Sequence, residues 1–200
     1  VPVYRQLFAD TLTPVSAFQK VSDTDYAFLL ESADGGEKIA KYSTIGSNPF
    51  AGFKCKGSNV EIFNKEGITH IETTDPFKVL EQQISKFSPV RVNGLPDFFG
   101  GAVGYTSYDS VRYVETLPDS TVDDLNLPDM YFMFYDETIV FDHLNKTIKV
   151  VCAAHIDERD IQEIYEDTVN KIDNVTNKLR TPVMTLSDDI TEKGELSLKF

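Results

Sequence analysis

The chain has 200 residues, of which 41% are hydrophobic and 12% aromatic, enough apolar material for the core of a folded domain. It carries 19 Lys and Arg against 32 Asp and Glu, which gives a formal net charge of −13. Nucleic-acid phosphates and anionic lipid headgroups would be repelled by such a surface. The composition therefore argues against a nucleic-acid or membrane partner.

The cysteines and the apolar runs indicate the cellular compartment. Cys55 and Cys152 have no CxxC partner, which argues against a disulfide framework or a thiolate zinc site and favours two reduced, buried thiols. No stretch has the layout of a signal peptide, and none approaches the ~18 apolar residues that span a bilayer. We therefore expect a soluble, cytoplasmic protein.

The first part of the chain combines one short helix with a series of strands. Residues 3–8 are extended, and Thr13 followed by Pro14 is a helix start, with Thr13 as the cap and Pro14 at the first helical position. Short runs of strand-forming residues follow, separated by turn residues, and predict an antiparallel meander. These runs are 26–32, 38–46, 50–56, 60–64 and 68–73.

A second helix and a glycine-containing strand come next. Asp75 and Pro76 predict a helix start, an apolar face runs to Phe87, and Pro89 ends the helix. The strand 98–105 (FFGGAVGY) lacks both the GxGxxG order of a dinucleotide site and the Gly-Lys-Ser/Thr of a phosphate loop. Its glycines predict a bend or the close approach of another backbone, with direct ligand contact as the alternative.

The last part of the chain contains an aromatic hairpin and the longest helix. After an acidic surface loop at 111–127, residues 130–135 and 138–141 form one long strand, which turns at 142–145 into 147–153. Asp157 is expected to cap a helix with an apolar stripe ending at Leu179. Alternation resumes at 196–200, so we expect the natural chain to continue past Phe200.

Because strands occur in runs and do not alternate with helices, the fold class is α+β. We expect largely antiparallel sheets, arranged as an orthogonal sandwich with flanking helices. Residues 1–180 would form this domain, and residues 181–200 a linker into a further region.

Signals for catalysis are weak throughout the chain. His70, His143 and His155 have no second ligand at i+3 or i+4, so a histidine metal site is not expected. His143 falls in a predicted turn and is expected to be exposed, and a general base would need a partner there. No GxSxG or HExxH signature is present. We assign no catalytic residue, and a binding or regulatory domain is favoured over a complete enzyme.

The pattern with most functional content is formed by residues 28–32 (FLLES) and 41–46 (KYSTIG). If these runs pair as a hairpin, the carboxylate of Glu31, the hydroxyl of Ser32 and the ammonium of Lys41 meet at one end of a sheet. Such a set of groups can hold the ammonium and the carboxylate of a free amino acid. The alternative is an exposed carboxylate and an exposed lysine at strand ends.

Several stretches in this order resemble a known family. They are residues 12–18 (LTPVSAF), 29–32 (LLES), 41–46, 99–105, Tyr108-Asp109, Arg112 and 128–130 (PDM). Together they resemble the N-terminal region of anthranilate synthase component I, over essentially the whole chain. The related component I of aminodeoxychorismate synthase shares this architecture and stays open as an alternative, as does a free-standing amino-acid-binding module.

The resemblance implies a specific activity for the full-length protein. The family enzyme converts chorismate to anthranilate and pyruvate, with Mg²⁺ and with ammonia from a glutamine amidotransferase subunit. Its chorismate and magnesium residues belong to a C-terminal half, so no cofactor is expected in this segment. The N-terminal region carries most of a feedback site for L-tryptophan. Matched onto this chain, that site comprises Glu31, Ser32, Lys41 and Pro14.

Overall fold

The structure is a computed structural model that describes residues 1–8, 11–22, 25–31, 41–118 and 122–182. Within these residues the chain forms ten strands in two five-stranded sheets, three α-helices and one 3-10 helix. All the strand pairings in this part of the chain are antiparallel. The predicted α+β class with antiparallel sheets is confirmed.

The first sheet has the strand order β1-β10-β9-β3-β2. Its strands are β1 (Pro2–Phe8), β2 (Phe28–Glu31), β3 (Tyr42–Gly46), β9 (Glu137–Asp142) and β10 (Thr147–Ala153). The β9–β10 hairpin confirms the one predicted around residues 142–145. Because β1 pairs along β10, the N-terminal strand extends this hairpin into a sheet.

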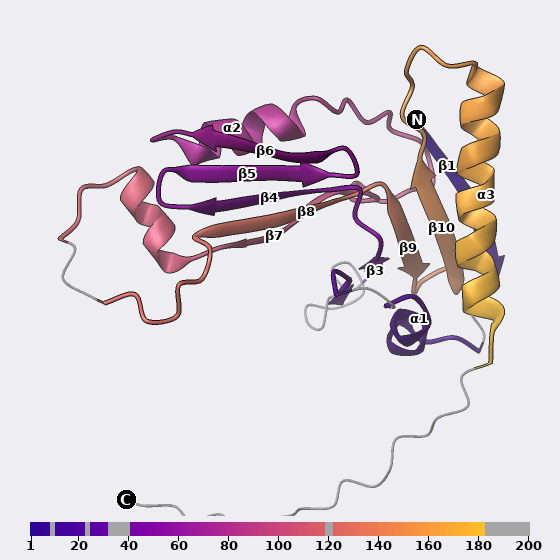
Figure 1. Ribbon diagram of the computed structural model, residues 1–200. Helices are drawn as coiled ribbons and strands as arrows, with labels where there is room; N and C mark the ends of the chain where they lie inside the picture. The colour runs from indigo at the N-terminus through magenta and orange to yellow at the C-terminus, as the bar shows by residue number, and fades with distance from the viewer. Residues whose placement is uncertain (9–10, 23–24, 32–40, 119–121, 183–200) are drawn as a thin grey trace, which may run out of the picture.

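The second sheet has the order β6-β5-β4-β8-β7, and its strands run across those of the first (Figure 1). Its strands are β4 (Ala51–Lys56), β5 (Asn59–Asn64), β6 (Gly67–Glu72), β7 (Gly101–Thr106) and β8 (Met130–Tyr135).

Two sequence predictions about strand connectivity were wrong for one reason. The strands between residues 26 and 73 do not form a single meander, and residues 130–141 are not one strand. The chain passes from the first sheet to the second between β3 and β4, and returns at Asp136 between β8 and β9. Apolar residues flank both crossings because the strands on either side are buried, so the sequence pattern alone does not show where a sheet ends.

The three α-helices begin where a capping side chain accepts from the first turn. Thr13 caps α1 (Pro14–Val21), and Asp75 caps α2 (Pro76–Ile84), as predicted. α2 ends earlier than expected, so that Phe87 lies beyond the helix, with its ring 5.5 Å from that of Phe50.

The third helix, α3 (Ile161–Arg180), corrects a predicted cap. Asp160, not Asp157, accepts from the backbone N–H groups of Gln162 (2.8 Å) and Glu163 (3.4 Å). The Asp157 carboxylate is instead occupied by Arg159, whose backbone N–H lies 2.9 Å from it. Both aspartates precede the apolar stripe, and their tertiary surroundings decide which of them caps the helix.

The glycine-containing segment and the acidic loop also differ in detail from expectation. Strand β7 begins at Gly101, and a Cβ at Gly104 would lie 1.9 Å from the backbone oxygen of Tyr131. This confirms the interpretation of close backbone approach. Part of the predicted loop at 111–127 is helical, because a 3-10 helix covers Tyr108–Tyr113.

The hydrophobic core has separate centres on the two sheets. In the first, Ile45, Ile139 and Val150 pack with residues of α1 and α3, which cover one face. In the second, Phe53, Cys55 and Met130 pack with Val79 and Leu80 of α2. Both cysteines are buried free thiols, as expected.

Candidate functional site

The predicted hairpin exists and brings Glu31 and Lys41 to the same end of the first sheet. β2 pairs with β3 so that Glu31, the last residue of β2, lies opposite Ser43. Lys41 directly precedes β3, two positions before Ser43. Ser32, the third predicted residue, lies outside the described residues.

Pro14 belongs to the helix that covers this hairpin. It occupies the first turn of α1, and α1 packs against both β2 and β3. Pro14 and Glu31 therefore lie on elements that contact each other, and Lys41 directly precedes β3, which contacts both, although 27 positions separate Pro14 from Lys41 in the sequence.

The charge of Lys41 is well defined. Its Nζ lies 4.8 Å from the centre of the Tyr42 ring, a cation–π distance. Tyr42 is the main cause that raises the pKa of Lys41 above its usual value, and the carboxylate of Asp142 acts in the same direction. Lys41 is thus a cation at neutral pH, and the carboxylate of a ligand can pair with it.

The sequence interpretation missed His143 at this end of the sheet. Its ring was expected to be exposed in a turn, but Nε2 lies 2.7 Å from Oγ of Ser43, and its backbone N–H donates to the Lys41 carbonyl (3.0 Å). A hydroxyl beside an imidazole resembles a nucleophile with its base. Ser43 is only 2% exposed, which favours a structural role for this pair over a nucleophilic one.

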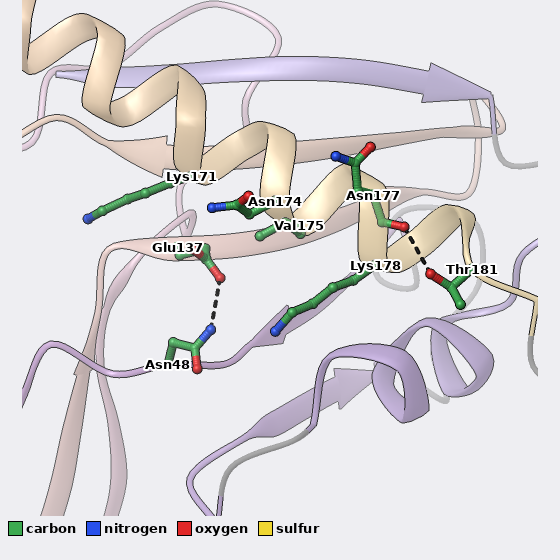
Figure 2. Close-up of a pocket in the computed structure, with 8 residues that line it drawn as sticks. All are labelled: Asn48, Glu137, Lys171, Asn174, Val175, Asn177, Lys178 and Thr181. Atoms are coloured by element: carbon green, nitrogen blue, oxygen red, sulfur yellow. Dashed lines mark hydrogen bonds between the residues drawn. The ribbon is translucent and has the colours of Figure 1, made fainter.

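A polar groove lies at the opposite end of β3 (Figure 2). It has a volume of about 540 Å³, and polar side chains of α3, including Lys171, Asn174 and Lys178, form one wall. At its base Glu137 is 9% exposed and accepts a long hydrogen bond of 3.5 Å from Asn48. Burial raises the pKa of this carboxyl.

The carboxylate next in sequence has the opposite behaviour. Asp136 is buried, which by itself would raise its pKa, but the hydrogen bond with His155 (3.2 Å) and the ammonium of Lys171 (3.0 Å) lower it on balance. Asp136 and His155 border a second, largely apolar cavity of about 640 Å³, walled by aromatic rings such as Phe50 and Phe87.

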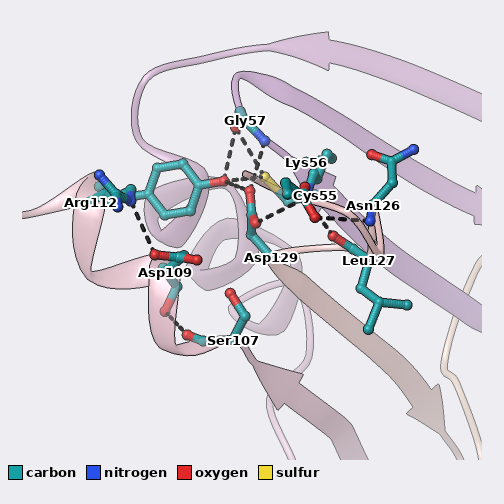
Figure 3. Close-up of polar contacts among 12 residues, drawn as sticks. Cys55, Lys56, Gly57, Ser107, Asp109, Arg112, Asn126, Leu127 and Asp129 are labelled. Atoms are coloured by element: carbon teal, nitrogen blue, oxygen red, sulfur yellow. Dashed lines mark hydrogen bonds and ion pairs between the residues drawn. The ribbon is translucent and has the colours of Figure 1, made fainter. Parts of the chain in front are cut away.

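A third polar cluster fastens the 3-10 helix to the second sheet (Figure 3). The Tyr113 hydroxyl donates to Asp129 (2.7 Å), and Asp129 accepts in turn from the backbone N–H of Gly57 (2.8 Å). Lys56 adds ion pairs with Asp123 and Asp129. The side chains of Tyr113, Asp129 and Lys56 all have partners within the chain, which indicates a structural role.

Thiol and metal chemistry find no support in the described part of the chain. Burial raises the pKa of Cys55 and Cys152, so both are protonated at neutral pH and are poor nucleophiles. In residues 1–182, apart from the undescribed gaps, no three His, Cys, Asp or Glu side chains are placed to hold a metal ion. In the same residues, no helix is long and apolar enough to cross a membrane.

Fold and site define an α+β domain with two crossed antiparallel sheets, in which Glu31 and Lys41 lie at the same end of one hairpin. Residues 25–194 match the family model described as chorismate binding enzyme. The chain belongs to this family.

Two curated relatives show which members of the family this chain is similar to. Anthranilate synthase component 1 of Acetivibrio thermocellus is 37% identical over 175 residues, which is 88% of this chain and 35% of the relative. The protein of the same name from Acinetobacter calcoaceticus is 37% identical over 191 residues, or 92% and 37% of the two chains. The chain thus spans little more than a third of these curated relatives.

A solved structure agrees with this comparison. The crystal structure of anthranilate synthase component I from Streptococcus pneumoniae superposes with a TM-score of 0.60 at 26% identity. The match covers 89% of this chain and 37% of that one. The resemblance noted from the sequence is confirmed.

Proposed function

We propose that this chain is the N-terminal part of an anthranilate synthase component I, which in full length converts chorismate and ammonia to anthranilate and pyruvate in tryptophan biosynthesis. The observation that carries this proposal is the similarity over about nine tenths of the chain to proteins of that name. The crossed-sheet fold supports it independently of sequence identity.

The role of this segment in the proposed enzyme is to bind L-tryptophan as a feedback inhibitor. Glu31 would pair with the ammonium of the ligand, Lys41 with its carboxylate, and Ser32 would line the site. The confirmed β2–β3 pairing supports this assignment because it sets an anion and a cation at one end of the sheet. The helix that starts at Pro14 packs against both strands.

Catalysis would take place in the C-terminal half. The resemblance to anthranilate synthase component I assigns Mg²⁺ and chorismate to that half, so we route no chemical step through this segment. The glutamine amidotransferase subunit, which supplies ammonia, is the proposed partner of the whole protein.

Inhibition would follow from thermodynamic coupling. Tryptophan bound where the two halves meet would favour an arrangement that holds chorismate poorly. Chorismate would then weaken tryptophan binding by the same factor. Because a segment of the C-terminal half completes the site, the 200-residue chain alone should bind tryptophan weakly or not at all.

The test uses the full-length enzyme and measures the tryptophan concentration that halves each variant's own uninhibited rate. Ser32→Phe and Lys41→Met should raise this concentration by roughly tenfold or more, because one fills the site and the other removes its cation. Ser58→Phe in an exposed turn and Lys54→Met on the second sheet are matched controls and should leave it unchanged. Wild-type inhibition of both site variants would refute the assignment.

A second assay tests whether catalysis takes place in the C-terminal half and not in the 200-residue chain. The 200-residue chain is incubated with chorismate, ammonium and Mg²⁺, and anthranilate is followed by its fluorescence, with the full-length enzyme as the positive control. We expect no anthranilate above the reaction without protein. Turnover by the short chain would show that the active site lies within it.

A further inference from the structure

His143 lies where the turn after β9 meets the segment that enters β3. Its imidazole Nε2 is 2.7 Å from the hydroxyl of Ser43, and its backbone N–H donates to the carbonyl of Lys41. The ring also stacks on Phe141, with centroids 6.5 Å apart and an interplanar angle of 23°. One residue therefore holds both Lys41 and the first buried hydroxyl of β3.

The register extends this contact to Glu31. Ser43 lies directly opposite Glu31 on β2 and opposite Phe141 on β9. Directly opposed residues in an antiparallel ladder present their side chains on the same face. The His143–Ser43 hydrogen bond thus acts on the residue that adjoins Glu31 across the hairpin.

The burial of Ser43 makes the loss of its hydrogen bond with His143 costly. Ser43 is 2% exposed, so without His143 its hydroxyl would lose a partner that water cannot easily replace. The turn that carries His143 would also lose the side-chain contact that aligns its backbone N–H with Lys41. The other two histidines contact different elements: His155 pairs with Asp136, and His70 lies near Glu61 on the second sheet.

We propose that His143 is a positioning residue for the amino-acid site at Glu31 and Lys41. It does not touch the ligand. Its bond to Ser43 fixes the turn against β3, which sets the Lys41 backbone relative to Glu31 before the ligand arrives. A preformed distance between the two charges lowers the ordering cost of binding a zwitterion. This inference rests on the tryptophan site of the proposed function.

The experiment measures tryptophan inhibition of the full-length enzyme, scored for each variant against its own uninhibited rate. His143→Ala should raise the half-inhibitory tryptophan concentration by roughly five- to thirtyfold, the range expected for losing a buried hydrogen bond that preorganises the site. His143→Gln should restore inhibition to within about threefold of wild type, because its amide can reach Ser43 in place of Nε2.

Two controls separate positioning from a general loss of stability. Val150→Ala removes a buried side chain of the same sheet, so it should lower the melting temperature without changing tryptophan inhibition. His70→Ala removes an exposed histidine and should change neither quantity. If His143→Ala does not fold, Ser43→Ala removes the same hydrogen bond from the other side and should raise the half-inhibitory concentration alike.

The outcomes also distinguish this inference from the proposed function. If Ser32→Phe and Lys41→Met relieve inhibition while His143→Ala and Ser43→Ala are inhibited like wild type, His143 has no positioning role and the tryptophan site stands. If none of these variants alters inhibition, the site itself is wrongly placed. If His143→Gln is as insensitive as His143→Ala, the ring packs against the site without acting through the hydrogen bond, and the proposal fails.

Discussion

The two sheets have the same number of strands but very different exposure. In the first sheet every residue of β9, and all but the last of β10, is buried. Helices α1 and α3 cover one face, and Phe99 and Leu95 pack on the other. In the second sheet β6 and β7 are mostly exposed, with α2 contributing to the core on one face.

Comparing one ion pair from each sheet shows how the difference in exposure affects the energy of a charged pair. Lys149 and Asp142 are 3.8 Å apart with side chains 7% and 2% exposed, whereas Lys54 and Glu61 are 3.4 Å apart and 41% and 35% exposed. The geometry is similar and the surroundings differ. A charge removed from the buried pair leaves its partner in a poorly solvated site, while water takes over at the exposed pair.

The largest expected effect is the loss of the buried carboxylate. Asp142→Ala should lower the free energy of unfolding by about 3–5 kcal/mol, because the ammonium of Lys149 stays buried without its partner. Glu61→Ala, the matched change in the second sheet, should cost about 1 kcal/mol or less. Urea denaturation of both variants measures the difference, and equal losses would contradict the comparison.

Substitutions of apolar core residues test the same difference in burial between the two sheets, without a change of charge. Ile139→Ala in β9 should cost about 2–5 kcal/mol, because the side chain is 2% exposed and its removal leaves a cavity in the core. Ile71→Ala in the edge strand β6 should cost about half of that or less, since it is only partly buried. Thermal unfolding provides the measurement. A larger loss for Ile71→Ala would show that the second sheet carries the main core.

Two glycines sharpen the comparison at a smaller scale. Gly104→Ala should cost about 1–3 kcal/mol, because its new methyl group meets backbone atoms of Tyr131 and Phe132. Gly46→Ala in the first sheet meets the ring of Phe28, a side chain that can turn, so its loss should be smaller. The midpoints of urea unfolding decide the order, and the reverse order would show that Phe28 is held more rigidly than the β8 backbone.

The smallest effect concerns the junction between the sheets and depends on pH. Burial raises the pKa of Glu137, so its contribution to stability is fully present below the usual carboxyl value and is lost as the pH rises through its folded-state pKa. The wild-type protein should therefore lose free energy of unfolding between about pH 4 and neutral pH, as Glu137 ionises. Glu137→Gln should not show this part of the loss, because glutamine does not titrate.

At the same junction, the contribution of Asp136 to stability depends on pH in the opposite direction to that of Glu137. Its pKa is lowered, so the stability it contributes is present above the usual carboxyl value and is lost as the pH falls through its folded-state pKa. Asp136→Asn should flatten the acid limb of the stability curve, whereas Glu137→Gln should not. Unfolding midpoints from pH 3 to pH 7 distinguish the two, and a Glu137→Gln curve parallel to that of wild type would contradict the assignment.

Local signals predicted most of the secondary structure. Thr13 and Asp75 were identified as caps because each precedes a proline and an apolar face, and both act as such in the structure. The hairpin that joins Glu31 to Lys41 followed from two apolar runs, and its register is observed. The site assigned to these residues stays a prediction, and Ser32 lies outside the described residues.

The polar groove and the contact of His143 with Ser43 could not be predicted from local sequence signals. The polar groove at Glu137 combines Asn48 with side chains of α3 more than 120 positions away. The sequence predicts an exposed turn residue at His143, and only the pairing of β3 with β9 brings it to Ser43. A histidine in the turn of an apolar hairpin was the sequence signal that could have raised the question.

By itself, the sequence determined most of the strands, the three α-helices of the described residues, that the sheets are antiparallel, and that Glu31 and Lys41 share one end of a hairpin. These properties depend on periodicity, caps and turns, which act over a few residues. The tertiary structure alone decided which strands share a sheet, that Asp160 caps α3, and that His143 holds the segment before β3. Such outcomes depend on contacts between residues distant in sequence, where burial and hydrogen bonding select among arrangements that local propensity leaves equivalent.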